Sequence, residues 1–186
     1  MKFEARSGTQ GSADDLHCNS ILFVCWGNVC RSPAAELILK REMNRRGFGN
    51  MKIKSAGVAA DHERNRPSFG MKWATLCRGL WLSPKPAMFQ KIHCSQYDLI
   101  IAMDRRVQHS IRAIAKQVPI NIKLLSDFLP QGWPVDVPDP MNRSVAKCNL
   151  VLDMLHSACQ EMANTLGLPR YAENRSVTHL PKLTSA

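Results

Sequence analysis

Apolar residues recur along the chain in short blocks that follow two different periods. Four short runs, at residues 21–24, 51–55, 99–102 and 121–125, are continuously apolar or alternate with polar residues, as β-strands do. Between and after them, segments with an apolar residue every three or four positions predict helices at 33–46, 68–79, 104–116 and 143–166. Because strands alternate with helices, we expect an α/β domain with a doubly wound, four-stranded parallel sheet and helices on both faces.

The length of 186 residues fits one domain with a substantial core. We place this domain at residues 21–168. Residues 1–20 are polar, carry both signs of charge and contain no apolar stretch typical of secretory signals, so we interpret them as a flexible leader. We interpret residues 169–186 as a loose tail. No apolar run reaches the roughly 20 residues of a membrane span. We expect a cytoplasmic protein that is a monomer or a weak dimer.

The formal charge of +10 is spread along the chain rather than concentrated in one basic run. Because no such run is interleaved with aromatic residues, we do not expect nucleic-acid binding. We expect the positive surface to attract anionic substrates instead.

The seven cysteines are odd in number and form no pair of CxxC motifs. This pattern does not favour a disulfide scaffold or a zinc ribbon, and we expect no metal or other cofactor. Cys77, Cys148 and Cys159 fall in predicted helices and are interpreted as buried thiols. Cys25 and Cys30 stand in a loop and need a different explanation.

The loop after the first predicted strand carries the most reactive group of the chain, the thiol of Cys25. Cys25 ends the strand, five residues follow, and Arg31 and Ser32 stand where the next helix begins. A helix N-terminus and a neighbouring arginine both favour the thiolate, the form in which a cysteine attacks. Gly27 and Asn28 tolerate positive φ, which lets successive N–H groups turn inward as an anion nest.

The residues at the end of this loop suit an oxyanion as well. Arg31 offers a planar fork that matches two oxygens of a phosphate. Ser32 can donate a hydrogen bond to the sulfur of Cys25 and so ease its departure as a leaving group. Neither a Gly-Lys-Ser/Thr nor a GxGxxG motif occurs. The sequence therefore predicts a phosphate-binding loop after the first strand, for phosphate or an analogue such as arsenate.

Residues 21–36, ILFVCWGNVCRSPAAE, resemble the signature of the low-molecular-weight protein tyrosine phosphatases. Three further segments match that family in the same order: Ser55-Ala56-Gly57, the run YDLIIAMD at 97–104, and Asp139-Pro140. The resemblance covers about residues 21–166 and leaves both ends of the chain outside it.

The resemblance implies an enzyme that removes phosphate from phosphotyrosine in proteins through a phosphocysteine intermediate. Cys25 would attack phosphorus while Arg31 and the loop amides hold the equatorial oxygens. Asp139 would protonate the leaving phenolate and then activate the water that hydrolyses the intermediate. Asp139 lies in a proline-rich loop at 128–140, where Asp136 is a competing carboxylate.

The resemblance also implies supporting roles around these catalytic residues. The residues expected to bind phosphate or to support the loop are Trp26, Gly27, Asn28, Val29, Cys30, Ser32 and Ser55. In relatives with a second cysteine in the loop, as here at Cys30, it can form a reversible disulfide that protects the nucleophile. The alternative for Cys30 is a small residue that packs within the loop.

The chain departs from its relatives where they bind the substrate. Many relatives carry a histidine that supports the loop at the position of Pro84, and animal relatives carry a tyrosine pair at Met141-Asn142. Residues 60–62 are polar where relatives often place an aromatic residue. Trp26 is then either the missing aromatic wall or a side chain packed on the surface.

Three other functions use the same fold or the same loop. A protein arginine phosphatase typically has threonine at the position of Val29, where a branched aliphatic residue favours phosphotyrosine. A thiol-dependent arsenate reductase needs two further cysteines close together, whereas Cys77 and Cys94 are far apart in the sequence. A non-enzymatic phosphate-binding regulatory module would lack the nucleophile, the arginine or the acid.

Overall fold

The computed structural model describes residues 18–60, 67–141 and 144–166. Its strands are β1 (Ser20–Cys25), β2 (Lys52–Gly57), β3 (Leu99–Ala102) and β4 (Ile122–Leu124). Its helices are α1 (Arg31–Arg45), α2 (Phe69–Leu76), α3 (His93–Gln96), α4 (Arg105–Ala115), the 3-10 helix η1 (Leu125–Phe128) and α5 (Val145–Leu166).

All four strands and all four long helices predicted from the sequence are present, with small shifts at their ends. The helices α3 and η1 were not predicted, because four residues are too few to show a helical period. Cys18, Asn19 and Ser20 belong to the fold rather than to a leader. Cys18 is buried, and the backbone N–H groups of Asn19 and Ser20 both donate to Oδ2 of Asp98 at 2.9 Å. The rest of the predicted leader and the predicted tail lie outside the described residues.

The four strands form one parallel sheet in the order β2-β1-β3-β4. The chain moves from β1 to β2 on one side and then crosses to β3 on the other side of β1. The loops that follow β1 and β3 therefore leave the sheet in opposite directions, and ligands bind at such a switch point in open α/β sheets. In this chain these loops are the predicted phosphate-binding loop and the turn at Met103-Asp104.

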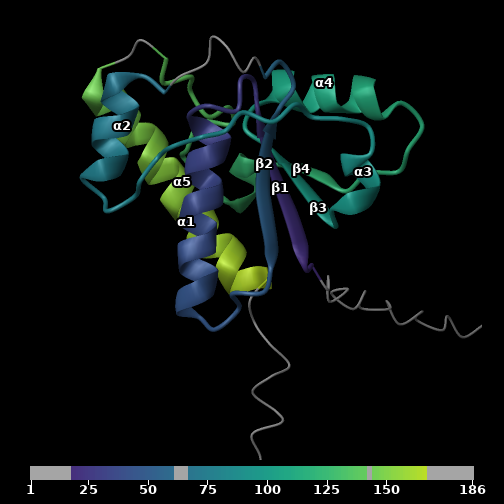
Figure 1. Ribbon diagram of the computed structural model, residues 1–186, viewed down its shortest axis with the longest axis horizontal. Helices are drawn as coiled ribbons and strands as arrows, with labels where there is room; N and C mark the ends of the chain where they lie inside the picture. The colour runs from purple at the N-terminus through teal and green to yellow at the C-terminus, as the bar shows by residue number, and fades with distance from the viewer. Residues whose placement is uncertain (1–17, 61–66, 142–143, 167–186) are drawn as a thin grey trace, which may run out of the picture.

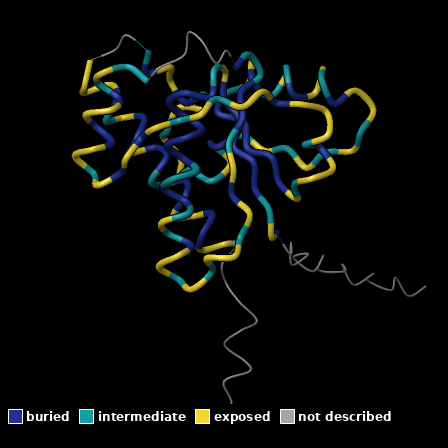
Figure 2. The backbone as a smooth tube through the Cα atoms, in the orientation of Figure 1, coloured by how far each residue is buried: buried dark blue, intermediate teal, exposed yellow. Residues whose placement is uncertain are grey.

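Helices cover both faces of the sheet, as expected (Figure 1). In β1, Ile21 and Phe23 belong to the core beneath α1 and α5, and Leu22 and Val24 belong to the core beneath α4. This alternation leaves every residue of β1 after Ser20 buried, as the dark central strand in Figure 2 shows. The sheet and its flanking helices thereby fix the carboxyl end of β1.

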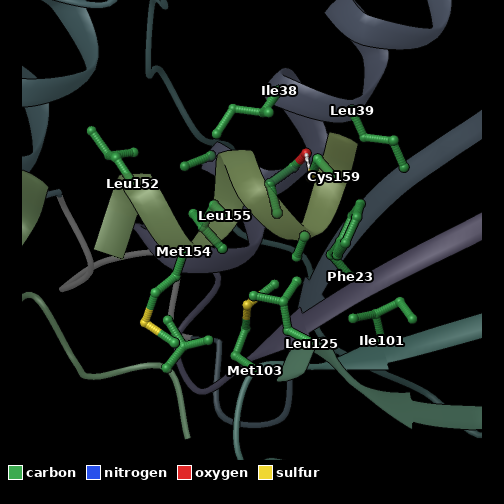
Figure 3. Close-up of a cluster of buried hydrophobic side chains, with 14 of the residues drawn as sticks. Phe23, Ile38, Leu39, Ile101, Met103, Leu125, Leu152, Met154, Leu155 and Cys159 are labelled. Carbon is green, nitrogen blue, oxygen red and sulfur yellow. Dashed lines mark hydrogen bonds between the residues drawn. The ribbon is translucent and has the colours of Figure 1, made fainter. Parts of the chain in front are cut away.

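The larger core lies between the sheet and the helix pair α1 and α5 (Figure 3). Figure 3 shows Phe23 of β1 facing Leu155 and Cys159 of α5. The Cys159 thiol donates a 3.7 Å hydrogen bond to the carbonyl of Ala35, which joins α5 to the first half of α1. This packing holds α1 against the sheet.

Two of the three cysteines predicted to be buried in helices are buried, namely Cys148 and Cys159. The prediction that Cys77 is buried was wrong, because Cys77 is exposed. Cys77 follows the last residue of α2, whose buried residues are Met71, Ala74 and Thr75. None of the helices in the described ranges has both the length and the apolar character needed to cross a membrane.

Candidate active site

The predicted phosphate-binding loop lies at the carboxyl end of β1. Cys25 pairs with Gly57 of β2, residues 26–30 bend away from the sheet, and α1 begins at Arg31. Cys25 is only 2% exposed. The backbone N–H groups of Gly27, Val29 and Cys30 donate to no protein acceptor in the described part of the chain. These donors are the groups that an anion needs at such a position.

Two donors converge on the sulfur of Cys25. The hydroxyl of Ser32 lies 2.9 Å from Sγ, and the backbone N–H of Asn28 lies 3.2 Å from it. The same hydroxyl also lies 3.2 Å from the carbonyl of Ala56. A hydroxyl has one hydrogen, so it can serve only one of these acceptors at a time. A negatively charged sulfur is the stronger acceptor, and the contact therefore favours the thiolate.

Asn28 holds the loop in shape with both its backbone and its side chain. Its φ of 54° is in the left-handed region, as predicted. The amide Nδ2 donates to the Ser32 hydroxyl at 3.0 Å, and Oδ1 accepts the backbone N–H of Ala87 at 2.8 Å. Gly27, which also tolerates positive φ, does not adopt it.

The segment before α3 supports the loop through its backbone. The Ala87 amide, three residues after Pro84, donates to the side chain of Asn28. The segment is anchored to β2, because Gly57 donates to the carbonyl of Ala87 and accepts from the N–H of Phe89, both at 2.8 Å.

Gly57 is also the residue on which the loop rests. A Cβ atom at this position would lie 2.7 Å from the carbonyl oxygen of Trp26 and 2.8 Å from the backbone nitrogen of Asn28. Both of these atoms are backbone, so they cannot swing aside. The loop can approach β2 this closely only because Gly57 has no side chain.

Arg31 is held by groups from two other parts of the chain, the residue that precedes α4 and the proline-rich loop. Its Nη1 donates to Oδ2 of Asp104 at 2.6 Å and to the carbonyl of Val137 at 3.0 Å. Its Nη2 lies 3.7 Å from Oδ2 of Asp139. Val137 is itself fixed, because its N–H donates to the carbonyl of Met103 at 2.9 Å. The proline-rich loop is thus tied both to the end of β3 and to the predicted phosphate clamp.

The two carboxylates of the proline-rich loop lie in different surroundings. Asp139 is next to Arg31, its side chain is 56% exposed, and its Oδ1 accepts the backbone N–H of Met141 at 3.0 Å. Asp136 faces Arg105 instead, and its two oxygens take contacts of 2.7 to 3.2 Å from that guanidinium. Hydrogen bonds from Arg105 hold the pKa of Asp136 below its usual range. Of the two carboxylates, only Asp139 lies next to Arg31 at the phosphate-binding loop.

The remaining predicted residues are in the loop, with one exception. Within the loop, Val29 and Cys30 are buried. Burial raises the pKa of the Cys30 thiol to about 12. Trp26 is 37% exposed, and Cζ of Arg106 lies 3.8 Å from the centroid of its ring. Ser55 is not brought to the loop. Its hydroxyl donates to Glu36 of α1 at 2.6 Å, and Ser55 lies two residue pairs before the Cys25–Gly57 pair at which the loop begins.

Four parts of the site were not predicted from the sequence: Asp104 as the partner of Arg31, the Val137 carbonyl, the Ala87 amide and Arg106. Asp104 was expected to begin a helix and stands in the matching run 97–104, but no role at the site was predicted for it, although its place two residues after β3, at the switch point, is a signal for one. The two backbone groups have no residue-type signal.

The protein-family model for low molecular weight phosphotyrosine protein phosphatases matches residues 20–170. The Escherichia coli (strain K12) low molecular weight protein-tyrosine-phosphatase Etp is 32% identical over 154 residues, which cover 81% of this chain and 97% of Etp. The tyrosine phosphatase Wzb from Escherichia coli K30, solved in complex with sulphate, aligns with a TM-score of 0.71 and 29% identity, covering 81% of this chain and 99% of Wzb.

The fold is also shared with a related enzyme of different specificity. The arginine phosphatase YwlE aligns with a TM-score of 0.72 and 26% identity over 82% of this chain and 98% of YwlE. The family match spans the phosphate-binding loop, the supporting strands and the proline-rich loop described above. The chain belongs to the low molecular weight phosphotyrosine protein phosphatase family and is an enzyme of that class.

Proposed function

We propose that the chain hydrolyses phosphotyrosine in protein substrates, with Cys25 as the nucleophile. The observation that carries this proposal is the convergence of the Ser32 hydroxyl, at 2.9 Å, and the Asn28 amide, at 3.2 Å, on the sulfur of Cys25. A sulfur with two donors and a helix N-terminus beside it is stabilised as a thiolate. Attack of this sulfur on phosphorus forms the S–P bond while the P–O bond to tyrosine breaks.

Arg31 and the free loop amides are proposed to hold the three remaining phosphate oxygens. With Nη1 engaged by Asp104 and Val137, the guanidinium keeps a fixed plane and offers its other donors to the phosphate. The N–H groups of Gly27, Val29 and Cys30, which have no backbone acceptor among the described residues, supply further donors. Donors arranged before the reaction stabilise the charge of the transition state without having to reorganise.

Asp139 is proposed as the general acid and then the general base. Its carboxyl group lies next to Arg31 on a loop anchored by Val137, and it is exposed enough to meet a leaving group. It would give its proton to the tyrosyl oxygen as the P–O bond breaks. It would then take a proton from the water that attacks phosphorus, which breaks the S–P bond and restores the Cys25 thiolate.

Phosphotyrosine is favoured over the other two substrates on specific grounds. Val29 has the branched aliphatic side chain that favours phosphotyrosine over phosphoarginine, and Etp is a protein-tyrosine-phosphatase. Reduction of arsenate would need two further cysteines next to each other. Cys77 lies beyond α2, whereas Cys94 packs in the core on the other face of the sheet, so neither can reach the other.

The test compares a phosphotyrosine peptide, a phosphoarginine peptide and arsenate as substrates of the wild-type protein. We expect turnover of phosphotyrosine and its loss in Cys25→Ser, with Cys77→Ser as a control that retains full activity. Trapping of a phosphorylated Cys25 by rapid acid quench and mass spectrometry would identify the intermediate. Phosphotyrosine turnover by Cys25→Ser would overturn the mechanism, and preferential turnover of phosphoarginine would reassign the substrate.

Redox sensitivity and a reducing compartment, such as the cytoplasm, are further parts of the proposal. All seven cysteines are free, and the mechanism needs Cys25 as a thiol. Peroxide would oxidise Cys25 to a sulfenic acid, with which the Cys30 thiol would condense to a disulfide and release water. Peptide mapping after peroxide treatment should show a Cys25–Cys30 link and activity that dithiothreitol restores. Irreversible loss of activity in both the wild type and Cys30→Ser would contradict it.

A further inference from the structure

Arg106 and Trp26 form a stacked pair at the edge of the phosphate-binding loop. Cζ of Arg106 lies 3.8 Å from the centroid of the Trp26 ring. Trp26 directly follows Cys25, and its carbonyl oxygen accepts the backbone N–H of Ala59 at 2.9 Å, which fixes its backbone beside the nucleophile. The stack therefore places a positive charge from the first turn of α4 next to the loop that holds the phosphate.

The charge of Arg106 is not neutralised within the described part of the chain. The neighbouring arginines differ in this respect, because Arg31 pairs with Asp104 at 2.6 Å and Arg105 pairs with Asp136 at 2.7 Å. These two pairs engage the carboxylates nearest to the start of α4. The Arg106 guanidinium pairs with no carboxylate and donates no hydrogen bond there.

The stacked arrangement leaves the hydrogen-bonding edge of Arg106 available. A guanidinium that lies over an indole ring uses its face for the contact, so its N–H groups point outward in the plane. Both side chains are accessible, since Trp26 is 37% exposed and Arg106 is an exposed residue. The stack also restricts the rotamers of Arg106, so less conformational entropy is lost when an anion binds.

We propose that Arg106, held on Trp26, is a second anion-binding position that recognises a negatively charged side chain next to the phosphotyrosine of the substrate. The inference rests on the proposed function, because it assigns a substrate class to the same site. With the phosphate in the loop, residues adjacent to the phosphotyrosine pass over the rim formed by Trp26. A carboxylate or a second phosphate at such a position would meet the free edge of the guanidinium.

The test uses four phosphotyrosine peptides of equal length that differ only in the residues flanking the phosphotyrosine, which are alanine, glutamate, phosphoserine or lysine. We expect kcat/KM of the wild type to be about fivefold higher for the glutamate or phosphoserine peptide than for the alanine peptide, as an accessible ion pair allows. The preference should shrink as salt is raised to about 0.5 M. A preference for one of the two acidic peptides tells whether a carboxylate or a phosphate is recognised, and either supports the proposal.

Two variants of Arg106 assign the effect to this side chain. Arg106→Gln should abolish the preference for acidic peptides, and Arg106→Glu should reverse it in favour of the lysine peptide. Arg112→Gln, an exposed arginine further along α4, should keep the preference of the wild type. Melting curves of all variants establish that they fold.

Equal kcat/KM of the wild type for all four peptides would overturn this inference while leaving the proposed function intact. A preference that persists in Arg106→Gln would overturn it as well. Failure of the wild type to cleave any of the peptides would overturn the proposed function, and this inference with it.

Discussion

Asp104 accepts a 2.6 Å hydrogen bond from Nη1 of Arg31 through one carboxylate oxygen and caps helix α4 through the other. The capping bond runs from the backbone N–H of Val107 to Oδ1 at 2.7 Å. Arg31 is 5% exposed, so its partner largely decides how its guanidinium is oriented. A residue that begins one helix therefore also aims the predicted phosphate clamp at the start of another.

Replacing Asp104 by asparagine should separate these two roles. Asparagine caps a helix about as well as aspartate, so α4 should persist. Arg31 loses its charged partner, and a displacement of about 1 Å in such a clamp can cost on the order of 100-fold in rate. We expect kcat/KM for a phosphotyrosine peptide to fall about 10- to 100-fold, measured well below the melting temperature.

The matched control for this variant is Asp153→Asn on α5, which breaks the more exposed 2.8 Å ion pair with Arg78. It should leave kcat/KM unchanged, because surface ion pairs contribute about 1 kcal/mol at most and this one is not part of the site. Wild-type activity in Asp104→Asn would show that Arg31 is oriented by its other contacts.

Replacing Gly57 by alanine should displace the phosphate-binding loop. The added Cβ would stand 2.7 Å from the Trp26 carbonyl and 2.8 Å from the Asn28 nitrogen, and the backbone has to move to relieve this overlap. We expect kcat to fall on the order of 100-fold and the free energy of unfolding to fall by about 1–3 kcal/mol. Steady-state kinetics and urea unfolding measure the two effects.

Gly49→Ala is the matched control for this substitution. A Cβ at Gly49 would lie 2.9 Å from the amide oxygen of Asn44, which is the end of a side chain that can turn away. Activity should therefore stay at the wild-type level. Equal losses in the two variants would mean that the effect comes from glycine replacement in general rather than from the loop.

The fold could be predicted because each strand and long helix shows its own period in the sequence. The strand at 99–102 is apolar throughout and is buried on both faces, and Ser68, Asp104 and Gly79 mark helix ends where they were expected. The short helices α3 and η1 have no such signal.

Within the site, a nucleophile, a phosphate-binding arginine and an acid could be proposed from the sequence because their residue types carry the chemistry. The Ala87 amide could not, because any residue except proline presents an N–H. The stack of Arg106 on Trp26 depends on how α4 lies against the loop, which no local pattern encodes. Ser55 matched a family motif, yet its hydroxyl is engaged by Glu36.

Asp139 and Asp136 should differ sharply in their effect on the leaving group, because only Asp139 lies next to Arg31. Hydrogen bonds from Arg105 lower the pKa of Asp136, so this carboxyl group holds a proton less readily than an ordinary aspartate does. Asp139→Asn should lower kcat for phenyl phosphate, whose leaving group is poor, by about 100-fold. The loss for nitrophenyl phosphate should be much smaller, because its leaving group departs without a proton.

Asp136→Asn is the comparison for this prediction and should leave the dependence of kcat on the leaving group unchanged. Its effect on stability should be small, since the ion pair of Asp136 with Arg105 is exposed. The stability that this pair contributes is present above the ordinary pKa of an aspartate and is lost as the pH falls through the lowered pKa of Asp136. The opposite pattern in the two variants would make Asp136 the acid.

Cys30 and Cys18, which are buried and are not the proposed nucleophile, should resist alkylation at neutral pH. Burial raises the pKa of Cys30 to about 12 and that of Cys18 to about 11, so below these values both remain thiols. At pH 7.5 fewer than about one in a thousand would be the reactive thiolate. Iodoacetate should therefore label Cys25, whose loop attracts anions, and the exposed Cys77, while labelling of Cys30 should begin only as the pH rises well above 9.

Peptide mass mapping measures each site, and inorganic phosphate should protect Cys25 but not Cys77. Labelling of Cys30 at pH 7.5 as fast as that of Cys25 would contradict the prediction and would mean that the Cys30 thiol is ionised within the loop.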